Sequence, residues 1–236
     1  MKSLFFLIFS YLFINSTFSQ NDFYRYVVVE DNVTTRSKRI SSDNTIYLPD
    51  DIIGTPYSDE IFYKGTIFEN NESTIKDLFF RYNAFQDFIE VKKKLSDPDS
   101  KIFLLKKDPN VLIKFNDEYL MFDEKINGYY QILFIGDNYK LYKKLYKKYY
   151  KPITAKSSFE KDVLATYKDI PKYFLVDNEN NLYEFPDSKN KKIKLFGNKK
   201  TEIQKYVKSN RLDINDEDIL IKVVRYFDTF EDASPQ

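Results

Sequence analysis

The pattern of hydrophobic and polar residues divides this chain into three regions. An apolar run from Leu4 to Ile14 stands behind one basic residue, Lys2. Over residues 61–185, short runs rich in Ile, Phe, Tyr, Leu and Val alternate with turn residues, which is typical of an antiparallel β meander. After Pro186 the apolar residues recur at the spacing of an amphipathic helix. The pattern therefore predicts a sheet-rich body followed by helices.

The predicted strands are separated by residues that tolerate the positive φ of hairpin turns. Such turns are predicted at Asn116-Asp117, Asn127-Gly128 and Gly136-Asp137-Asn138. The strand after Asn127-Gly128 is apolar on both faces, which predicts a central place in the sheet. The predicted strands cover residues 61–68, 75–82, 85–91, 102–105, 111–115, 118–122, 129–135 and 139–146, and a final hairpin pairs 173–176 with 182–185.

The C-terminal helices are predicted from apolar spacing and from end signals. A short first helix stops before Gly197, and a second ends near Asn210. The third begins with Asn215 as its N-cap, and the acidic residues 216–218 complement the positive end of its dipole. The apolar stripe of this third helix comprises Ile219, Leu220, Val223, Val224 and Phe227.

The chain is predicted to belong to the α+β class, mainly β, as an antiparallel meander or partial barrel of about eight to ten strands with two or three C-terminal helices. One strand-like run, 23–29, precedes a polar stretch, 30–44, that predicts a loop. The predicted divisions are a signal peptide (1–19), an N-terminal extension with one possible strand (20–60), an antiparallel β domain (61–185), a helical segment packed on it (186–230) and a tail (231–236).

The first nineteen residues have the features of a cleavable secretory signal peptide. A short polar tail follows the apolar core, and in it Thr17 and Ser19 place small side chains before a cut ahead of Gln20. The rival interpretation is a membrane anchor, but a spanning helix needs about 20 apolar residues, roughly twice the run present. A lipoprotein is excluded because the chain has no cysteine. We therefore expect an exported protein, periplasmic or extracellular, without a transmembrane segment after signal cleavage.

Composition excludes several kinds of chemistry. Because the chain has no cysteine and no histidine, Ser-His-Asp and Cys-His catalysis, histidine-bound zinc and disulfides are ruled out. No cofactor or metal is expected. Asp177, Glu179 and Asn181 alternate as the ligands of a calcium loop do. However, Leu182 replaces the glycine that such a loop requires, and Ser188 replaces its bidentate glutamate, which favours a polar hairpin turn.

Carboxylate catalysis is the one hydrolytic chemistry that the composition leaves open, since a glycosidase can act with two acidic residues. The best candidate pair is Asp87 and Glu90, which flank Phe88-Ile89. A solvated strand face explains this pair better. Enzyme activity is thus left open, and a non-enzymatic role is favoured.

Aromatic residues are abundant, with 20 Tyr and 22 Phe, and a core built from them is favoured over a ligand groove lined by tyrosine. Without residues 1–19, whose one charged residue is Lys2, the chain is formally neutral.

Within this neutral chain, a strip rich in lysine and tyrosine follows residue 139. It suits acidic polymers or lipid head groups. The alternatives are lysines that solvate a strand or blunt a sheet edge, or a helix with a four-residue repeat. The candidate binding residues are Lys140, Tyr142, Lys143, Lys144, Tyr146, Lys147 and Lys148.

Several short segments are similar to those of one group of exported proteins. They are residues 54–60, with Gly-Thr-Pro-Tyr-Ser-Asp-Glu, residues 64–67, with Lys-Gly-Thr-Ile, residues 81–91, and the Val-Arg-Tyr-Phe of 224–227. On these segments the chain resembles uncharacterised exported proteins of Bacteroidota, particularly Flavobacteria, over roughly residues 54–230. The resemblance implies an exported β-rich domain and transfers no catalytic residue.

The favoured function is that of a non-enzymatic envelope protein, a binding or structural module that recognises a protein, glycan or lipid. A carboxylate-dependent glycan hydrolase is the alternative and would need two carboxyl groups facing each other in one cleft. A nucleic-acid partner is disfavoured. A sheet closed around an apolar cavity would indicate a carrier, whereas a sheet filled by Phe and Tyr would indicate surface recognition.

Overall fold

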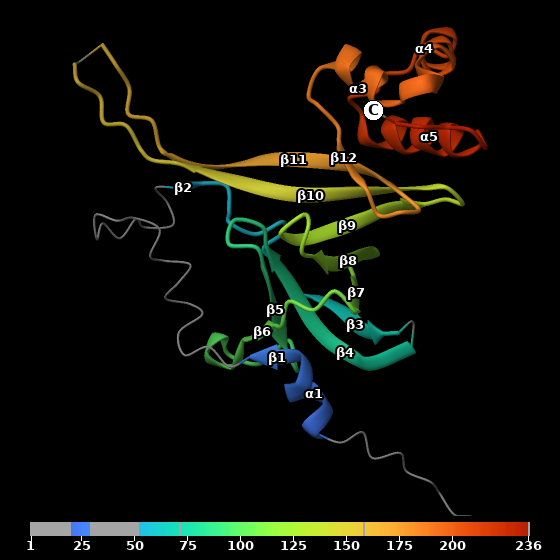
Figure 1. Ribbon diagram of the computed structural model, residues 1–236. Coiled ribbons are helices and arrows are strands. Elements are labelled where there is room, and N and C mark those ends of the chain that lie inside the picture. The colour runs from blue at the N-terminus through green and yellow to red at the C-terminus, as the bar shows by residue number, and fades with distance from the viewer. Residues whose placement is uncertain (1–19, 29–51, 71, 158, 236) are drawn as a thin grey trace, which may run out of the picture.

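The computed structural model describes residues 20–28, 52–70, 72–157 and 159–235. The predicted signal peptide, 1–19, and the predicted loop, 30–44, lie outside these residues. Within them, one sheet of twelve strands is followed by helices (Figure 1), which confirms the predicted mainly β fold with C-terminal helices. The strands are β1 (Val27–Val28), β2 (Ile52–Ile53), β3 (Tyr63–Glu69), β4 (Glu72–Asn83), β5 (Phe88–Lys92), β6 (Phe103–Leu105), β7 (Val111–Phe115), β8 (Glu118–Asp123), β9 (Gly128–Ile135), β10 (Tyr139–Tyr150), β11 (Ala165–Asp177) and β12 (Leu182–Glu184). The α-helices are α1 (Gln20–Tyr26), α3 (Lys189–Leu195), α4 (Lys200–Ser209) and α5 (Glu217–Asp228), with short 3-10 turns at Asp99–Lys101 and Gly197–Lys199.

The sheet consists of two meanders that meet between β3 and β7. Its strand order is β1-β6-β5-β4-β3-β7-β8-β9-β10-β11-β12, with β2 paired to β11. The chain runs outward from β3 to β6, crosses back through residues 106–110 and continues from β7 to β12. The pairing of β2 with β11 is parallel, and the pairings within the two meanders are antiparallel. The described strands therefore form an open mixed sheet with β1 at one end and β12 at the other.

Turn chemistry explains two of the hairpins predicted in the second meander, whereas the predicted turn at residues 136–138 has no positive φ and two of its backbone amides instead donate to Asp228. Asn116 and Asp117 between β7 and β8 have φ of 50° and 58°, and Asn127 between β8 and β9 has φ of 53°. Asn and Asp tolerate this left-handed region, as the turn prediction requires. β9 lies between β8 and β10, which confirms its predicted central position.

The larger core is filled by aromatic and branched side chains from both meanders. Ile89 and Val91 of β5 are fully buried in it together with Ile113 of β7. Phe80 and Phe115 stack with their ring centroids 5.7 Å apart. Because side chains alternate along a strand, the residues between these buried ones point to the opposite face of the sheet.

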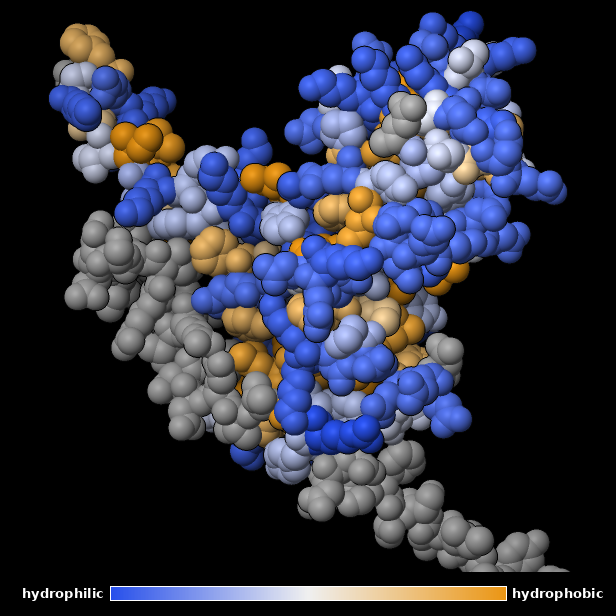
Figure 2. Space-filling view, viewed as in Figure 1, coloured by the Kyte–Doolittle hydropathy of each residue, from blue (hydrophilic) through white to orange (hydrophobic). Residues whose placement is uncertain are grey.

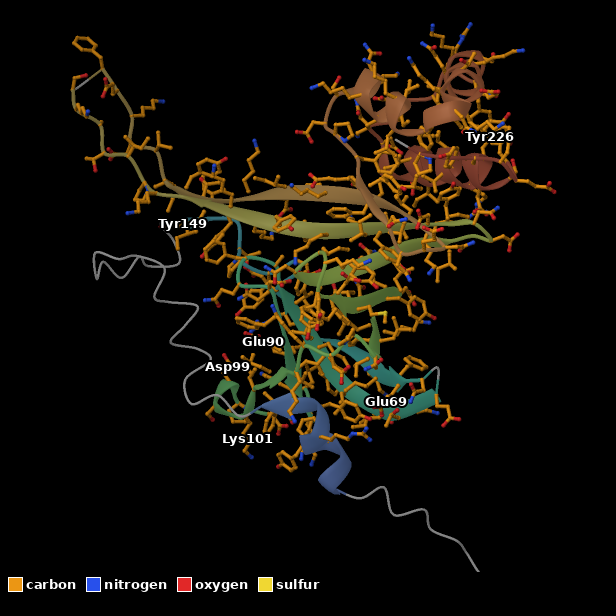
Figure 3. The ribbon with its side chains drawn as sticks, viewed as in Figure 1. Glu69, Glu90, Asp99, Lys101, Tyr149 and Tyr226 are labelled. Carbon is orange, nitrogen blue, oxygen red and sulfur yellow. The ribbon has the colours of Figure 1, made fainter. Side chains whose placement is uncertain are left out.

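A second core lies between β10–β11 and the C-terminal helices, which cover that end of the sheet (Figure 1). Leu141 and Leu175 contribute from the sheet, and Phe196 packs on Phe227 with a centroid distance of 4.9 Å. Four of the five residues of the predicted stripe of α5 are buried, and the fifth, Ile219, is half-buried. Tyr226, labelled in Figure 3, instead joins α5 to the neighbouring helix α4 through stacked rings.

The predicted N-cap of α5 is wrong by one residue. Asp216, and not Asn215, has the extended backbone of a cap, with φ of −73° and ψ of 134°. Its Oδ1 accepts a hydrogen bond of 3.0 Å from the backbone amide of Ile219. The backbone amide of Asn215 instead donates to Asp213 in the preceding turn. Asn and Asp are both favoured as N-caps, so the sequence does not distinguish Asn215 from Asp216. The backbone path of the preceding turn decides which of them caps the helix.

Other segments also differ from the prediction. In the strand-like run 23–29, residues 23–26 are helical and residues 27–28 form β1, which pairs with β6, while Val29 lies outside the described residues. Residues 85–87 form the turn before β5 and are not part of a strand. β10 and β11 are much longer than predicted, and β11 passes through Pro171. Proline fits because β2 and β12 pair with the two ends of β11 and leave its described middle as an edge.

Candidate functional site

A groove lies on the face of the sheet opposite to the C-terminal helices. Leu141 and Leu175 point to the helices, and their neighbours Tyr142, Phe174 and Val176 form a separate cluster on the other face. This face is hollowed to a volume of about 660 Å³, within the range of ligand-binding pockets. We call it the open-face groove. Its apolar lining comprises Phe68, Leu112, Met121, Phe122, Tyr130, Ile132, Ile135, Tyr142, Val176 and Leu182.

Cross-strand register explains why this lining is continuous. Phe68 of β3 pairs with Leu112 of β7. Leu112 in turn pairs with Met121 of β8, and Met121 pairs with Tyr130 of β9. Residues that are directly paired place their side chains on the same face of a sheet. The four strands therefore contribute one apolar row, which runs across the groove.

Two stacked tyrosines form the floor of the groove. The ring centroids of Tyr130 and Tyr142 are 4.2 Å apart, and the ring planes are inclined by 27°. Burial raises the pKa of both hydroxyl groups above the usual value for tyrosine. The two rings pack on Phe174 and Val176, and all four side chains are buried. The floor is thus uncharged, and the tyrosine faces are used for packing within the protein.

The rim of the groove is made by turns and by one lysine. Asn70 and Asn180 lie at the β3–β4 and β11–β12 turns, with φ of 52° and 60°. Lys125 Nζ donates a hydrogen bond of 2.7 Å to the backbone carbonyl of Asn180, which joins two turns at this rim. Lys140 lines the groove and forms no ion pair with another described residue. Ile135 is 63% exposed and offers apolar surface to a ligand.

The predicted basic strip is the strand β10 and not a helix. A strand alternates its side chains between two faces, so the strip is divided. Lys140 and Tyr142 line the open-face groove. Lys143 lies outside it, with Nζ 2.7 Å from Glu217 Oε2 at the start of α5.

The rest of the strip lies beyond the groove. Tyr146 has Lys144 Nζ 5.2 Å from its ring centroid. Lys147 Nζ is 2.7 Å from Asp169 Oδ1 on β11, and Lys148 is exposed. The structure therefore brings only Lys140 and Tyr142 of the strip into the groove, and ligand binding by the remaining residues stays a prediction.

Most groove residues are absent from the site predicted from the sequence. Leu112 illustrates the sequence pattern that indicates a second apolar face. Its neighbours Val111 and Ile113 are buried in the core, so an apolar residue between them faces the opposite side of the sheet. Met121 lies next to the buried Leu120 of β8 in the same way, whereas Ile132 of β9 stands between two partly buried residues and carries no such signal. Such residues mark a second apolar face, but the strand order is needed to bring them together.

Asp87 is the centre of a half-buried polar network and not part of a solvated strand face. Lys144 Nζ lies 3.0 Å from Asp87 Oδ1, and Lys107 Nζ lies 3.0 Å from Oδ2. The hydroxyl of Tyr82 and the backbone amide of Tyr129 donate to Oδ1 at 2.8 and 3.1 Å. Burial alone would raise the pKa of Asp87, but the charge of Lys144 and the hydrogen bonds outweigh it and lower that pKa.

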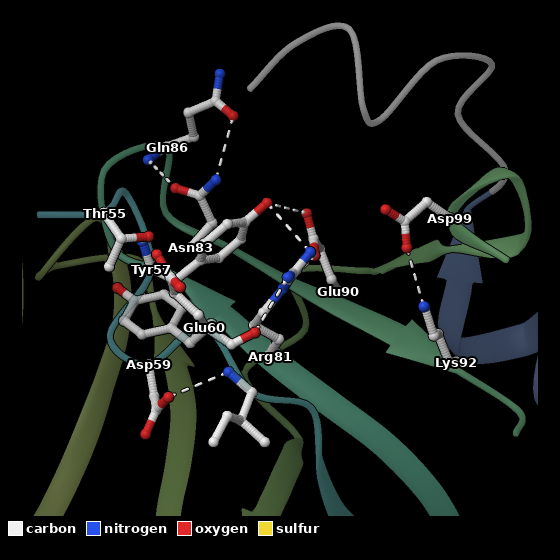
Figure 4. A network of polar contacts seen from close by, with 12 residues as sticks. Thr55, Tyr57, Asp59, Glu60, Arg81, Asn83, Gln86, Glu90, Lys92 and Asp99 are labelled. Atoms are coloured by element: carbon white, nitrogen blue, oxygen red, sulfur yellow. Dashed lines mark hydrogen bonds and ion pairs between the residues drawn. The ribbon is translucent and has the colours of Figure 1, made fainter. Parts of the chain in front are cut away.

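Glu90 belongs to a second network, shown in Figure 4, and is also not solvated. Arg81 donates from Nε to Glu90 Oε2 at 2.8 Å. Its guanidinium group lies between two rings, 3.9 Å from the centroid of Tyr57 and 4.3 Å from that of Phe62. Burial raises the pKa of Glu90 in spite of the nearby Arg81 charge. This carboxylate and its cation are therefore shielded together by aromatic side chains.

The two candidate carboxylates do not share a cleft. Arg81 and Tyr82 are adjacent in β4 and point to opposite faces of the sheet. Glu90 is bound on the Arg81 side, whereas Asp87 is bound on the Tyr82 side. The predicted solvated face is wrong for both residues, because Glu90 is buried and Asp87 is half-buried, each beside its own cation.

Residues 177–181 form the polar turn that the sequence predicts. Asp177 Oδ1 accepts hydrogen bonds from the backbone amides of Glu179 and Asn181 at 3.0 and 2.8 Å. Its Oδ2 accepts a further bond of 3.2 Å from the hydroxyl of Tyr183. Within the part of the chain that the structure describes, no cluster of side chains is suited to hold a metal ion. None of the helices in that part is long and apolar enough to cross a membrane.

The architecture defines a mainly β protein with an open mixed sheet, C-terminal helices and a groove on the uncovered face. No protein-family model, curated protein or solved structure matches the chain. The function is therefore inferred from the geometry of the groove.

Proposed function

We propose that this chain is an exported, non-enzymatic binding module whose open-face groove recognises an extended apolar segment of a partner protein. The observation that carries the proposal is the apolar row of Phe68, Leu112 and Met121, which are half-buried on a face that none of the described elements covers and lead to the buried Tyr130. Apolar area left in water costs roughly 25 cal/mol per Å², so a partner that buries this row gains free energy.

A glycan fits the groove less well than a protein segment does. Sugar rings bind to exposed faces of aromatic side chains, but Tyr130 and Tyr142 stack on each other and are only 4% and 8% exposed. The floor therefore offers apolar edges rather than open ring faces.

A lipid carrier function is also less well supported. Carriers enclose most of the ligand surface, whereas this groove lies on an open sheet and its rim carries polar turns. The larger core is filled by side chains such as Phe80, Ile89 and Ile113, which are fully buried. Because this core leaves no room for a lipid, recognition at the surface of the protein is favoured.

The polar rim suits a peptide backbone with an acidic neighbour. The amide side chains of Asn70 and Asn110 can pair with peptide groups at the groove edge. Lys140 can pair with a carboxylate next to the apolar residues of the partner, which would set the orientation of the segment. We therefore expect segments with several apolar side chains beside Asp or Glu.

Export is supported by the signal-like residues 1–19. A non-enzymatic role is supported by the absence of histidine and cysteine and by the separate burial of Asp87 and Glu90. The glycan hydrolase would need its two carboxyl groups on either side of one glycosidic bond, and the best candidates among the described residues, Asp87 and Glu90, lie on opposite faces of the sheet.

The proposal can be tested by selecting phage-displayed random peptides on the immobilised protein and measuring their affinities by fluorescence anisotropy. We expect enrichment of apolar peptides with an acidic residue. Met121→Lys and Ile135→Lys should weaken the selected peptides by about tenfold or more, because each places a charge in the apolar row or at its edge.

Leu95→Lys is the matched control, because Leu95 is 57% exposed and does not line the groove. This variant should bind the selected peptides as the unmodified protein does. Circular dichroism would verify that all three variants are folded. The proposal is wrong if no peptide is enriched, or if the enriched peptides bind the groove variants and the control equally well.

A further inference from the structure

A β-hairpin arm extends beyond the body of the protein. β10 pairs with β11 along its whole length, from Tyr139 to Tyr150, but pairs with β9 only as far as Lys143. The outer part of this hairpin and its connecting loop project away from the helices and the core (Figure 1). We call residues 147–168, of which Ser158 lies outside the described residues, the arm.

The loop of the arm is held by its own hydrogen bonds. Ile153 and Val163 form an antiparallel bridge with backbone bonds of 2.9 and 2.8 Å. Asp162 Oδ1 accepts from the backbone amide of Ala155 at 2.7 Å. These bonds give the loop a defined shape, so the exposure of its side chains is a property of the fold.

Apolar side chains on the arm face water. Phe159 is 98% exposed, and the bridged residues Ile153 and Val163 are 61% and 53% exposed. Leu164 adds a further side chain at 42%. Figure 2 shows hydrophobic residues along the arm and at its outer end. Large apolar side chains that are held together in solvent are typical of a site that binds a protein or a membrane.

The same arm carries a positive charge. Residues 147–168 contain six lysines and two carboxylates, a formal charge of +4, in a chain whose total is +1. The ion pair of Lys147 with Asp169, just outside the arm, lowers this excess to +3. Both carboxylates are used inside the loop, since Glu160 Oε2 accepts from the backbone amide of Lys156 at 2.9 Å and Asp162 binds Ala155. The lysines at Lys148, Lys156, Lys161 and Lys168 are exposed.

We propose that the arm docks on an anionic lipid surface, with Phe159 and the Ile153–Val163 pair inserted among the head groups and the lysines beside the lipid phosphates. Protein interfaces are depleted of lysine, whereas the exposed apolar residues of the arm lie among exposed lysines. A bilayer accepts a small apolar tip and rewards surrounding positive charge. The proposal does not depend on the open-face groove.

A tryptophan at the tip provides a direct test, because the chain contains none. We expect the emission maximum of Phe159→Trp to shift to shorter wavelength with vesicles of phosphatidylcholine and phosphatidylglycerol in equal amounts. Pure phosphatidylcholine should give little shift. Leu95→Trp is the matched control, since Leu95 is also exposed but lies in a different turn, and it should give no shift with either vesicle.

Co-sedimentation with the same vesicles measures the strength of binding. Phe159→Ser should lower the partition coefficient by about tenfold, because the removed ring no longer leaves water. Lys156→Gln and Lys161→Gln should each lower it by about fivefold at low salt and less at high salt. Leu95→Ser and the groove variant Met121→Lys should leave it unchanged, which separates this result from that of the peptide selection.

Several outcomes would overturn the proposal. One is the absence of a shift for Phe159→Trp with anionic vesicles. Another is equal binding of Phe159→Ser and the unmodified protein. A third is a shift of the tip tryptophan that grows with protein concentration in the absence of vesicles, because this would show that the arm docks on a second copy of the chain.

Discussion

Asp87→Ala should destabilise the protein strongly, because it leaves the ammonium group of Lys144 buried without its counter-charge. The Lys144 side chain is 2% exposed, and its Nζ lies 3.0 Å from Asp87 Oδ1. Apart from Asp87, it is hydrogen-bonded at 3.4 Å to the backbone carbonyl of Asn127. Removing one partner of a buried ion pair costs about 3–5 kcal/mol. The hydroxyl of Tyr82 and the amide of Tyr129 also lose their acceptor, so we expect a loss of about 4 kcal/mol.

A second substitution tests whether the buried charge is the cause. Lys144→Met removes the charge and keeps most of the length of the side chain. In the Asp87→Ala background it should restore about 2 kcal/mol, a coupling typical of residues in direct contact. Glu184→Ala is the matched control. Its partner Lys172 lies 2.6 Å away, but the two side chains are 48% and 43% exposed, so the loss should stay below about 1 kcal/mol.

The assay is urea unfolding at neutral pH, followed by circular dichroism, with the free energy of unfolding extrapolated to water. Two results would refute the reasoning. If Asp87→Ala lost no more stability than Glu184→Ala, the ion pair would not be a buried one in solution. If Lys144→Met restored nothing, the cost would arise from the lost hydrogen bonds of Asp87 and not from the charge of Lys144.

Two further predictions concern pH and packing. The folded pKa of Asp87 is lowered from an unfolded value of about 3.9, so its contribution is present at higher pH and is lost as the pH falls through the folded pKa. Asp87→Asn should therefore lose less stability than the unmodified protein when urea unfolding is repeated below about pH 4, and equal losses would contradict this assignment. Gly65→Ala should cost about 3 kcal/mol in the same assay at neutral pH, because its Cβ would lie 2.3 Å from the backbone carbonyl of Lys114 and 2.8 Å from the ring of Phe80. An unchanged urea midpoint would show that the sheet relaxes at this position.

Local sequence patterns are sufficient to predict the strands and turns of much of the second meander. The run predicted over residues 111–115 is the strand β7, and Asn116, Asp117 and Asn127 have the positive φ predicted for their turns. Alternation and turn chemistry depend on residues close together in the sequence, so no knowledge of distant contacts is required.

Where an apolar run has no clear helical or strand periodicity, tertiary packing decides its secondary structure. Phe23, Tyr26 and Val27 fit a helix face as well as a strand, and the structure buries all three on α1 and β1. Phe23 packs against Phe103 of β6 with a centroid distance of 5.0 Å, a contact across many residues of chain. The sequence near Phe23 contains no signal for this partner.

The roles of charged residues are also decided at a distance. Asp87 and Glu90 suggest a solvated pair when only their neighbours are considered. The cations that pair with them lie at different distances along the sequence. Arg81, the partner of Glu90, lies on the adjacent strand of the same hairpin, whereas Lys144, the partner of Asp87, comes from the other meander. Burial and counter-charge of a carboxylate depend on such contacts, which alternation within one strand does not specify.

By itself the sequence determined the mainly β character, the C-terminal helices, the hairpin turns and the absence of histidine and cysteine chemistry. Only the tertiary structure decided where the open-face groove lies. Phe68 and Leu112 share the open-face groove because the chain returns to pair β7 with β3 after building β4 to β6. The face on which a side chain lies depends on strand order and register, and a shift of one residue would turn the apolar row away from the groove.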